Sequence, residues 1–448
     1  RDVAVGGSDS GAVSVLEFQD SNGTVGILHC TEFGKTGCRR ATPGQYVASD
    51  PKGRAILIAA VEKRKLVYVL NRDASGKPTI ASPLEANRGR AITLGTVGID
   101  NGFDNPIFAS LEMQYDADQQ DSMQPEDTNG GAKGTQLPET QLAYYELDLG
   151  LNHVSRRWAT TTLQGACCLA AVPGAADGGP GGVLVGSEDW LEYLHDTMED
   201  QTSAGDSNHN KNAILSKRIC CALPRRRLHP KEKTTLVTHI TVHRQKKSKF
   251  FALAQTELGD LFKITIQLDT SVEPPKVVGL EAALLDTLPA ATSINVSKMG
   301  YLFAAVETGD HYLYQFQRFD LPDAPKCGSK DCQDALSKVE ESLSYWSKFR
   351  SVATKLAPTF DPTDLNNLRK VHMLENSAPT TGVMIGELAG DEVSPQIYLM
   401  AGRGPTSAMK VIRHGVSITE LAVSDLPGVP GGIFTVSDNS GSEGSDSK

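Results

Sequence analysis

The sequence predicts an all-β fold built as a propeller, and three observations support that class. An apolar run, a polar turn that contains glycine and a second apolar run recur along the chain. The turn glycines of two neighbouring copies, Gly259 and Gly309, are about 50 residues apart, a spacing found in propeller blades. The runs are short, rich in Val, Ile, Leu, Phe and Tyr, and end at Gly, Pro, Asn or Asp, as β-strands do. The repeats lie at residues 3–18, 55–70, 182–194, 250–266, 301–316 and 396–412.

The clearest unit is a hairpin of residues 301–306 and 311–316 around a polar turn. In its second strand Tyr312, Tyr314 and Phe316 alternate with more polar residues, so these three side chains share one face. This alternation predicts a half-buried strand. Residues 250–266 have the same form, and the blades lack the Trp-Asp consensus of WD repeats.

Three stretches interrupt the repeat and are predicted to be disordered insertions. Residues 116–140 and 195–212 contain few aliphatic side chains and many polar ones, a composition that cannot bury enough apolar surface to fold. Residues 321–358 differ, because apolar residues at steps of three and four predict a short amphipathic helix within this insertion. Such a helix either packs on the flank of the propeller or docks a partner, and the sequence leaves both open. The positions that define it are Leu336, Val339, Leu343, Trp346 and Phe349.

Composition limits the partner classes. The 448 residues include 54 acidic and 44 basic side chains, which gives a net charge of −10. Bulk binding to nucleic acid is disfavoured, because such proteins usually carry a basic surplus. No apolar run reaches the length of a membrane-spanning helix, so no membrane partner is expected. The chain starts inside a strand-like run at Arg1 and ends in a polar tail at Lys448, so we expect a piece of a longer protein.

The eight cysteines do not form a disulfide framework or a recognisable metal motif. Two adjacent pairs, at residues 167–168 and 220–221, border apolar residues, where a free cysteine acts as a small hydrophobic side chain. Cys327 and Cys332 are five residues apart in a stretch that reads as a polar loop, and no C-x-x-C motif occurs. No metal site is therefore predicted, and a reducing compartment is favoured.

Candidate catalytic and cofactor motifs fail on spacing. Residues 33–37 resemble the end of a phosphate-binding loop, but His29 stands where the first glycine is required. His239 and His243 are four residues apart in a strand-like run, which places them roughly 13 Å apart rather than together. No nucleophile–base pair is suggested, so no catalytic, cofactor-binding or metal residue is predicted. The alternative from another functional class is a propeller hydrolase with its active site in the central channel.

The densest positive cluster is the candidate partner contact. Arg225, Arg226 and Arg227 are consecutive, and a second basic stretch covers residues 244–249. Arginine's planar guanidinium suits carboxylates and phosphates, so an acidic protein or an RNA backbone would fit. We expect all three side chains of the first cluster to lie on the surface and to contribute to a partner contact.

Several stretches are specific enough to identify a family: residues 33–40, 48–55, 65–73, 145–153, 251–265 and 402–405, which spread over nearly the whole chain. They resemble the splicing factor 3b subunit 3 family of spliceosome-associated proteins. A second signature, residues 413–416 followed by 425–428, also resembles the large subunit of the UV-damaged-DNA-binding protein and the largest cleavage and polyadenylation specificity factor subunit. After this signature, Phe434 stands where those relatives usually have Trp.

The resemblance implies a seven-bladed β-propeller that is one of three in the whole protein. Residues 1–425 would form the first propeller without its opening strands. Residues 426–448 would start the second propeller and add an acidic, Ser-rich loop. The insertions and the tail depart from the family pattern, so the resemblance implies no role for them.

The same resemblance implies a non-catalytic scaffold subunit of the splicing factor 3b complex in the U2 small nuclear ribonucleoprotein, located in the nucleus. Its partners would be the HEAT-repeat large subunit and a small companion subunit, with RNA contacted mainly indirectly and no cofactor. The implied role is support of branch-site recognition and spliceosome assembly in pre-mRNA splicing. An adaptor of a cullin ubiquitin ligase or of the mRNA cleavage and polyadenylation complex is the alternative. Residues 39–40 and 147–153, which are splicing-specific, favour the first role.

Overall fold

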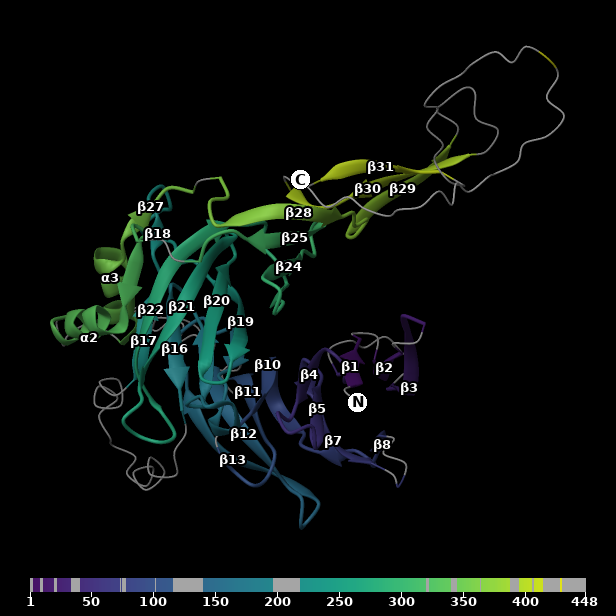
Figure 1. Cartoon of the computed structure of the whole chain (residues 1–448), viewed down its shortest axis with the longest axis horizontal. Helices are drawn as coiled ribbons and strands as arrows, with labels where there is room; N and C mark the ends of the chain where they lie inside the picture. The colour runs from purple at the N-terminus through teal and green to yellow at the C-terminus, as the bar shows by residue number, and fades with distance from the viewer. Residues whose placement is uncertain are drawn as a thin grey trace, which may run out of the picture.

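The computed structural model describes a chain that consists mainly of β-strands (Figure 1). The described residues are 3–8, 11–19, 22–33, 41–72, 74, 78–100, 102–115, 140–195, 218–319, 322–339, 345–362, 364–386, 395–404, 407–413 and 428. Of the predicted insertions, residues 116–139 and 196–212 lie outside this set.

In their described part, the first four large sheets are antiparallel and follow the chain in order. The first contains β1 (Val3–Gly7), β2 (Ala12–Gln19) and β3 (Thr24–Glu32). The second contains β4 (Tyr46–Ser49), β5 (Ala55–Ala59), β7 (Lys65–Arg72), β8 (Pro78–Ile80) and β9 (Leu84–Glu85). The third contains β6 (Glu62–Lys63), β10 (Arg88–Ile99), β11 (Ile107–Gln114), β12 (Thr140–Asp148) and β13 (His153–Thr161). The fourth contains β14 (Cys168–Ala171), β15 (Val183–Gly186), β16 (Trp190–Leu194) and β17 (Ile219–Ala222), with the short 3-10 helix η2 (Ala175–Asp177) between β14 and β15.

Three further large sheets and one small one complete the described strands. The fifth contains β19 (Val237–Lys246), β20 (Lys249–Thr256), β21 (Asp260–Asp269), β22 (Lys276–Thr287) and β26 (Lys326–Gly328). The sixth contains β23 (Ser293–Val296), β24 (Tyr301–Ala305), β25 (His311–Phe316) and β28 (Leu368–Leu374). The seventh contains β29 (Thr380–Gly386), β30 (Gln396–Ala401) and β31 (Ala408–Ile412). The small sheet is the parallel pair of β18 (Arg225–Arg226) and β27 (Thr359–Phe360).

The predicted hairpin is confirmed. β24 and β25 are paired, with Leu302 opposite Tyr314. Tyr314 is buried, and Tyr312 and Phe316 pack against the same core cluster, as the alternation predicted. The turn between β20 and β21 depends on Gly259, which has φ +87°. A Cβ at this position would overlap with the carbonyl oxygen of Leu288, so glycine is required there.

The first six large sheets pack face to face in succession, and each of their interfaces holds its own apolar cluster. In β5, for example, Ile56 and Ile58 face the first sheet, whereas Ala55, Leu57 and Ala59 face the third. Successive side chains of a strand point to opposite faces, so a strand between two neighbours must be apolar at every position. This explains why the sequence of β5 is a continuous apolar run rather than an alternating one.

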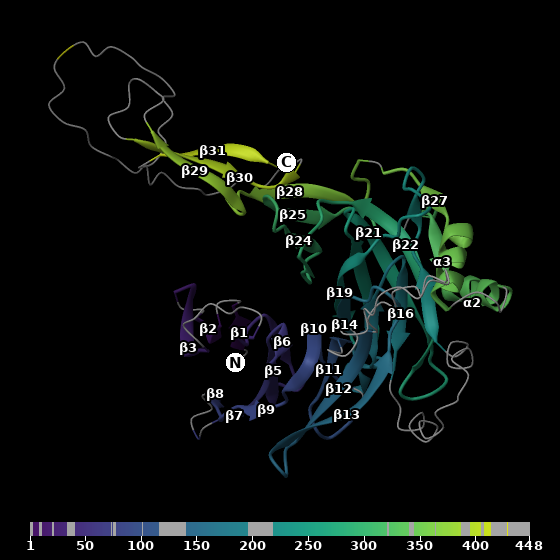
Figure 2. The ribbon, with the colours of Figure 1, turned by 180° about the vertical axis from the view of Figure 1, so that it is seen from behind.

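The sheets form an arc, and β1–β3 and β29–β31 lie at its two ends (Figure 1, Figure 2). Among the described strands, no pairing joins the first sheet to the last, so the ring is not closed. The all-β propeller prediction is therefore supported at the level of strand content and sheet stacking. In the described part of the chain, no helix has the length and apolarity needed to cross a membrane.

The prediction of a disordered insertion over residues 321–358 is wrong for its described part. It contains β26, α2 (Ser329–Ser337) and α3 (Tyr345–Leu356), so two helices replace the single predicted one. Leu336 and Val339 pack against the core cluster of the fourth and fifth sheets, and Phe349 is buried in it. The ring of Phe349 meets that of Trp190 edge-on at 4.9 Å. The helices are ordered because their apolar faces cover the outer flank of these sheets, while Leu343 lies outside the described residues.

A charged pair is buried between the second and third sheets. Lys65 Nζ lies 2.9 Å from Glu112 Oε1, and the two side chains are 2% and 0% exposed. The Tyr145 hydroxyl donates a hydrogen bond of 2.6 Å to the same carboxylate oxygen. Burial lowers the pKa of Lys65, and the Glu112 carboxylate partly offsets this by favouring the charged amine. The pair therefore connects β7, β11 and β12 at the cost of desolvating two charges.

Replacement of Lys65 by Met should destabilise the fold by about 3 kcal/mol, because it leaves the buried Glu112 carboxylate with only the more distant Arg156 guanidinium, at 3.9 Å, as a cation. The double variant Lys65→Met/Glu112→Gln should recover much of this loss, since the amide keeps an acceptor for Tyr145 and carries no charge. Urea unfolding of the three proteins measures both values. Equal stability of the single and double variants would contradict the role given to the charge.

Candidate functional site

The arginine cluster lies where an insertion rejoins the propeller. Arg225 and Arg226 form β18, which pairs in parallel with Thr359 and Phe360 of β27. The backbone N–H of Arg227 also donates to Phe360 O at 2.8 Å. This pairing attaches the segment that follows α3 to the loop between the fourth and fifth sheets.

Arg226 is bound within the protein. Its Nε and Nη2 donate to the two carboxylate oxygens of Asp260 at 2.8 and 2.9 Å, and Nη2 also donates to Leu258 O at 2.7 Å. Asp260 is only 2% exposed and accepts a further hydrogen bond from Thr287. A bidentate pair with a buried partner fixes the position of β18 relative to β21, so this guanidinium stabilises the fold.

Arg225 is likewise half-buried and engaged. Its guanidinium donates to Lys233 O at 2.6 Å and to Thr354 Oγ1 of α3 at 3.2 Å. It also lies near Asp189, whose pKa is raised by burial and lowered in part by the Arg225 charge. This side chain therefore holds α3 against the loop that precedes β19.

Arg227 differs from its two neighbours, because it faces solvent. It pairs with Asp361 at 3.3 Å, and the two side chains are 63% and 53% exposed. The next residue, Leu228, is 90% exposed. The expectation that all three lie on the surface is met fully by Arg227 and only in part by Arg225 and Arg226, which are half-buried and whose guanidiniums donate hydrogen bonds within the protein. The partner contact itself stays a prediction. The sequence pattern could not separate the three, since their buried partners are distant along the chain.

Two cavities in the described part of the chain are too small for a substrate. One lies beside the Arg226–Asp260 pair, and the other lies between the first and second sheets; each has a volume of about 10 Å³. This is room for about one water molecule. The second cavity contains His29, whose Nε2 lies 2.7 Å from Thr31 Oγ1, but its volume leaves no room for a substrate beside them.

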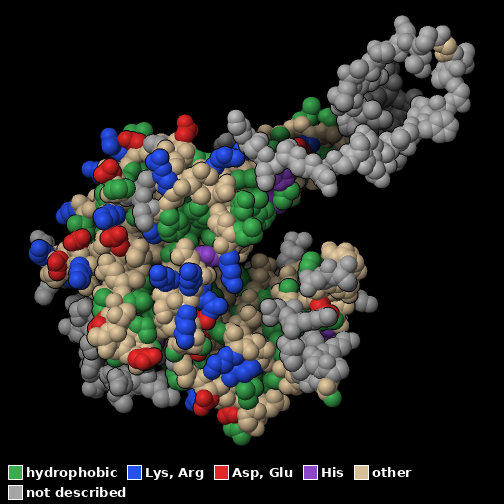
Figure 3. All heavy atoms as spheres, viewed as in Figure 1, with side chains coloured by type: hydrophobic (Ala, Val, Ile, Leu, Met, Phe, Trp, Pro, Cys, Tyr) green, Lys and Arg blue, Asp and Glu red, His purple; other side chains and the backbone are tan. Residues whose placement is uncertain are grey.

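Exposed apolar side chains gather on the last strands of the chain. They occur on both faces of the seventh sheet and on β28, and Figure 3 shows hydrophobic side chains around β25 and β28 on the face in view. Lys and Arg side chains gather on that face around β19 and β10, although the chain is acidic overall. The exposed apolar residues are Val371, Met373, Leu374, Val383, Met384, Ile385, Met400, Met409, Val411 and Ile412.

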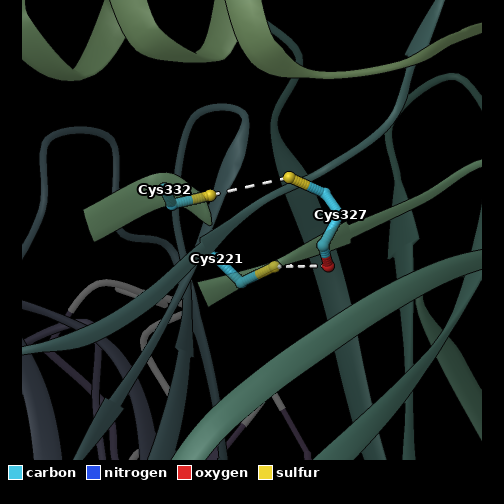
Figure 4. A group of neighbouring side chains, drawn as sticks. All are labelled: Cys221, Cys327 and Cys332. Carbon is cyan, nitrogen blue, oxygen red and sulfur yellow. Dashed lines mark hydrogen bonds between the residues drawn. The ribbon is translucent and has the colours of Figure 1, made fainter. Parts of the chain in front are cut away.

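Three cysteines converge beneath the helices. Cys221 lies on β17, Cys327 on β26 and Cys332 on α2. Their sulfur atoms are all within 4.8 Å of one another (Figure 4). Cys327 and Cys332 are 5% and 0% exposed, so the predicted polar loop around them is wrong. The sequence did not associate Cys221 with them, because it is 106 residues from Cys327.

The two histidines considered as a metal pair in the sequence instead connect neighbouring sheets. His239 and His243 both lie on β19. Burial lowers the pKa of each imidazole, and hydrogen bonds to the backbone of Ile294 and Val296 partly offset this. Both partners lie on β23, so the two histidines link the fifth sheet to the sixth.

Comparison with known proteins gives a consistent result. A family model described as the RSE1/DDB1/CPSF1 first beta-propeller matches residues 1–355. Spliceosome-associated protein 130 A of Arabidopsis thaliana is 41% identical over 98% of this chain. Splicing factor 3B subunit 3 of Drosophila melanogaster is 40% identical over 97%, and pre-mRNA-splicing factor rse1 of Neurospora crassa is 38% identical over 97%. The chain spans about one third of each relative's length, at 32%, 32% and 33% respectively.

Replacement of Arg226 by Ala should lower stability by about 2 kcal/mol, because Asp260 then keeps a buried charge without its bidentate partner. Replacement of Arg227 by Ala is the matched control and should change stability by less than about 0.5 kcal/mol, since both members of its pair are exposed. Denaturant unfolding measures the difference. Similar losses in the two variants would contradict the separate roles assigned here.

Proposed function

The chain belongs to the RSE1/DDB1/CPSF1 first-propeller family, and we propose from this premise that it is the first propeller of a splicing factor 3b subunit 3. The observation that carries the proposal is the extent of the similarity to named splicing proteins. Plant, insect and fungal relatives with such names each align over 97% or 98% of the chain. The alignment therefore includes residues after 355, where the match to the family model ends.

We propose that the complete domain is a closed ring of seven blades. Two features support it: the described strands form seven sheets of three or more strands, and the first six of these stack through separate apolar clusters. The sheets at the two ends of the arc have only three strands each. The terminal sheets also leave apolar side chains uncovered, among them Ile27 of β3 and Ile385 of β29 at 68% and 67% exposed. Further strands at these ends would cover them and remove the open edges.

The role that fits this architecture is a non-catalytic scaffold. Inner strands such as β5 and β16 are buried on both faces, its described cavities hold about one water each, and its exposed side chains include apolar groups suited to protein contacts. The partners proposed are the HEAT-repeat large subunit and a small companion subunit of the splicing factor 3b complex. RNA would be contacted mainly indirectly, and the setting would be the nuclear U2 ribonucleoprotein during branch-site recognition.

Within this scaffold, we place the candidate partner contact at Arg227 and Leu228. Arg227 offers a solvent-facing guanidinium, and Leu228 is a large apolar side chain with 90% of its surface exposed. An arginine beside an exposed apolar anchor is a composition typical of protein interfaces. Arg225 and Arg226 would act indirectly, by holding this loop in position through Lys233 and Asp260.

Affinity purification of the full-length protein from nuclear extract should recover the other splicing factor 3b subunits together with U2 RNA. Mass spectrometry and RNA sequencing of the bound material provide the measurement. Recovery of a cullin ligase or of polyadenylation factors in their place would overturn the splicing role, while the fold would stand.

The double variant Arg227→Glu/Leu228→Asp should reduce recovery of at least one partner subunit several-fold without a change in thermal stability. Leu151→Asp is the matched control, because Leu151 is also highly exposed, at 78%, but lies on the turn between β12 and β13. Quantitative mass spectrometry of the three purifications measures the effect. Unchanged association of the double variant would sink the proposed contact.

A further inference from the structure

The three cysteines beneath α2 and α3 differ from the other described cysteines in their grouping. Cys221, Cys327 and Cys332 come from β17, β26 and the first half of α2, and all three are buried. Their sulfur atoms approach one another rather than pointing into separate parts of the core (Figure 4). Cys327 Sγ and Cys332 Sγ are 3.5 Å apart, and each of the three sulfurs lies within 4.8 Å of the other two.

This spacing is close to that of thiolates around one metal ion. A zinc–sulfur bond of about 2.3 Å with tetrahedral or trigonal angles separates the sulfurs by about 3.8–4.0 Å. The 3.5 Å between Cys327 Sγ and Cys332 Sγ and the upper limit of 4.8 Å for the group lie on either side of that range. The three donors are fixed by different elements, so the arrangement is held by the fold and not by a single flexible loop.

The donor set also indicates the class of ion. Three sulfurs without an oxygen or nitrogen donor favour thiophilic cations with filled d shells, such as Zn²⁺ and Cu⁺. Among the described residues, no fourth His, Cys, Asp or Glu belongs to the group. Cu⁺ accepts three sulfur ligands, whereas Zn²⁺ would need a fourth ligand from outside the group.

The surroundings of Cys332 are suited to negative sulfur, because the backbone N–H of Ala222 points at Cys332 Sγ at 3.4 Å. The thiol of Cys221 instead donates to the carbonyl oxygen of Cys327 at 3.1 Å, a hydrogen bond that metal binding would replace. Cys332 lies near the N-terminus of α2, where the helix dipole favours negative charge. The site is thus a polar spot within an otherwise apolar cluster.

We propose that Cys221, Cys327 and Cys332 form a binding site for one thiophilic cation of the Zn²⁺ or Cu⁺ class, and that this ion fastens α2 and β26 to β17. Each cysteine that binds releases its thiol proton to solvent, and a sulfur–metal bond forms in its place, with no change in oxidation state. The ion would join a segment after residue 326 to a strand about 100 residues earlier, so it would stabilise the insertion on the propeller flank.

The test is a titration of the reduced, full-length chain with Zn²⁺ and, in a separate anaerobic arm, with Cu⁺, each against a chromophoric chelator. The expected result is one equivalent bound with submicromolar affinity and a rise in melting temperature for at least one of the two ions. The arm that binds identifies the ion. Absence of a bound equivalent in both arms would overturn the proposal without the need for any variant.

Variants then assign the ligands. Cys332→Ser should weaken binding by at least tenfold, and the sulfur-to-metal absorption of a Cd²⁺-loaded sample should fall by about one third for each of the three cysteines removed. Cys220→Ser is the matched control, because Cys220 is as buried as Cys221 but alternates to the other side of β17. Cys30→Ser, at an exposed position, controls for surface thiols. Loss of binding in a control, or its retention in all three variants of the group, would refute the assignment.

Discussion

The constraint on which the structure depends is that its inner strands, such as β5, β16 and β20, are buried on both faces. Each of the five apolar clusters lies between two consecutive sheets, and one strand contributes alternate side chains to two clusters. In β20, for example, Phe251 and Leu253 face the sixth sheet, while Ala252 and Ala254 face the fourth. Because a shift of one residue would exchange these faces, the stacking fixes the register of every inner strand.

This stacking determines where charge can be placed. A charged group between sheets loses its hydration, so it is found with a partner of opposite sign or with several hydrogen-bond donors. Glu192 has no exposed surface and pairs with Arg218 at 2.8 Å, and burial still raises the pKa of its carboxyl. Asp286 accepts three backbone N–H bonds, from Asn366, Asn367 and Leu368, and thereby attaches the start of β28 to β22. Such groups make the packing of the core specific, because apolar contacts alone would allow alternative arrangements of the strands.

The exposed features follow from the same geometry. Apolar residues that have a sheet on each side are buried, and those on the terminal sheets are not, although their sequences are similar in character. The α2–α3 segment covers one flank, and the arginines of β18 hold it through Thr354 and Asp260. The basic cluster is therefore divided between support of this segment and the solvent-facing pair of Arg227 and Leu228.

The sequence by itself determined the all-β class, the hairpin of residues 301–316, the family and the turn at Gly259, because each depends on local periodicity, a continuous motif or a single turn. Tertiary structure alone decided which arginines are available and which cysteines meet. Arg226 finds Asp260 34 residues later, and Cys221 meets Cys327 106 residues later. Order in residues 321–358 was missed for the same reason, since α2 and α3 are stabilised by a surface formed from distant strands. Side chains that are far apart along the chain are brought together by sheet stacking, and no local pattern records that contact.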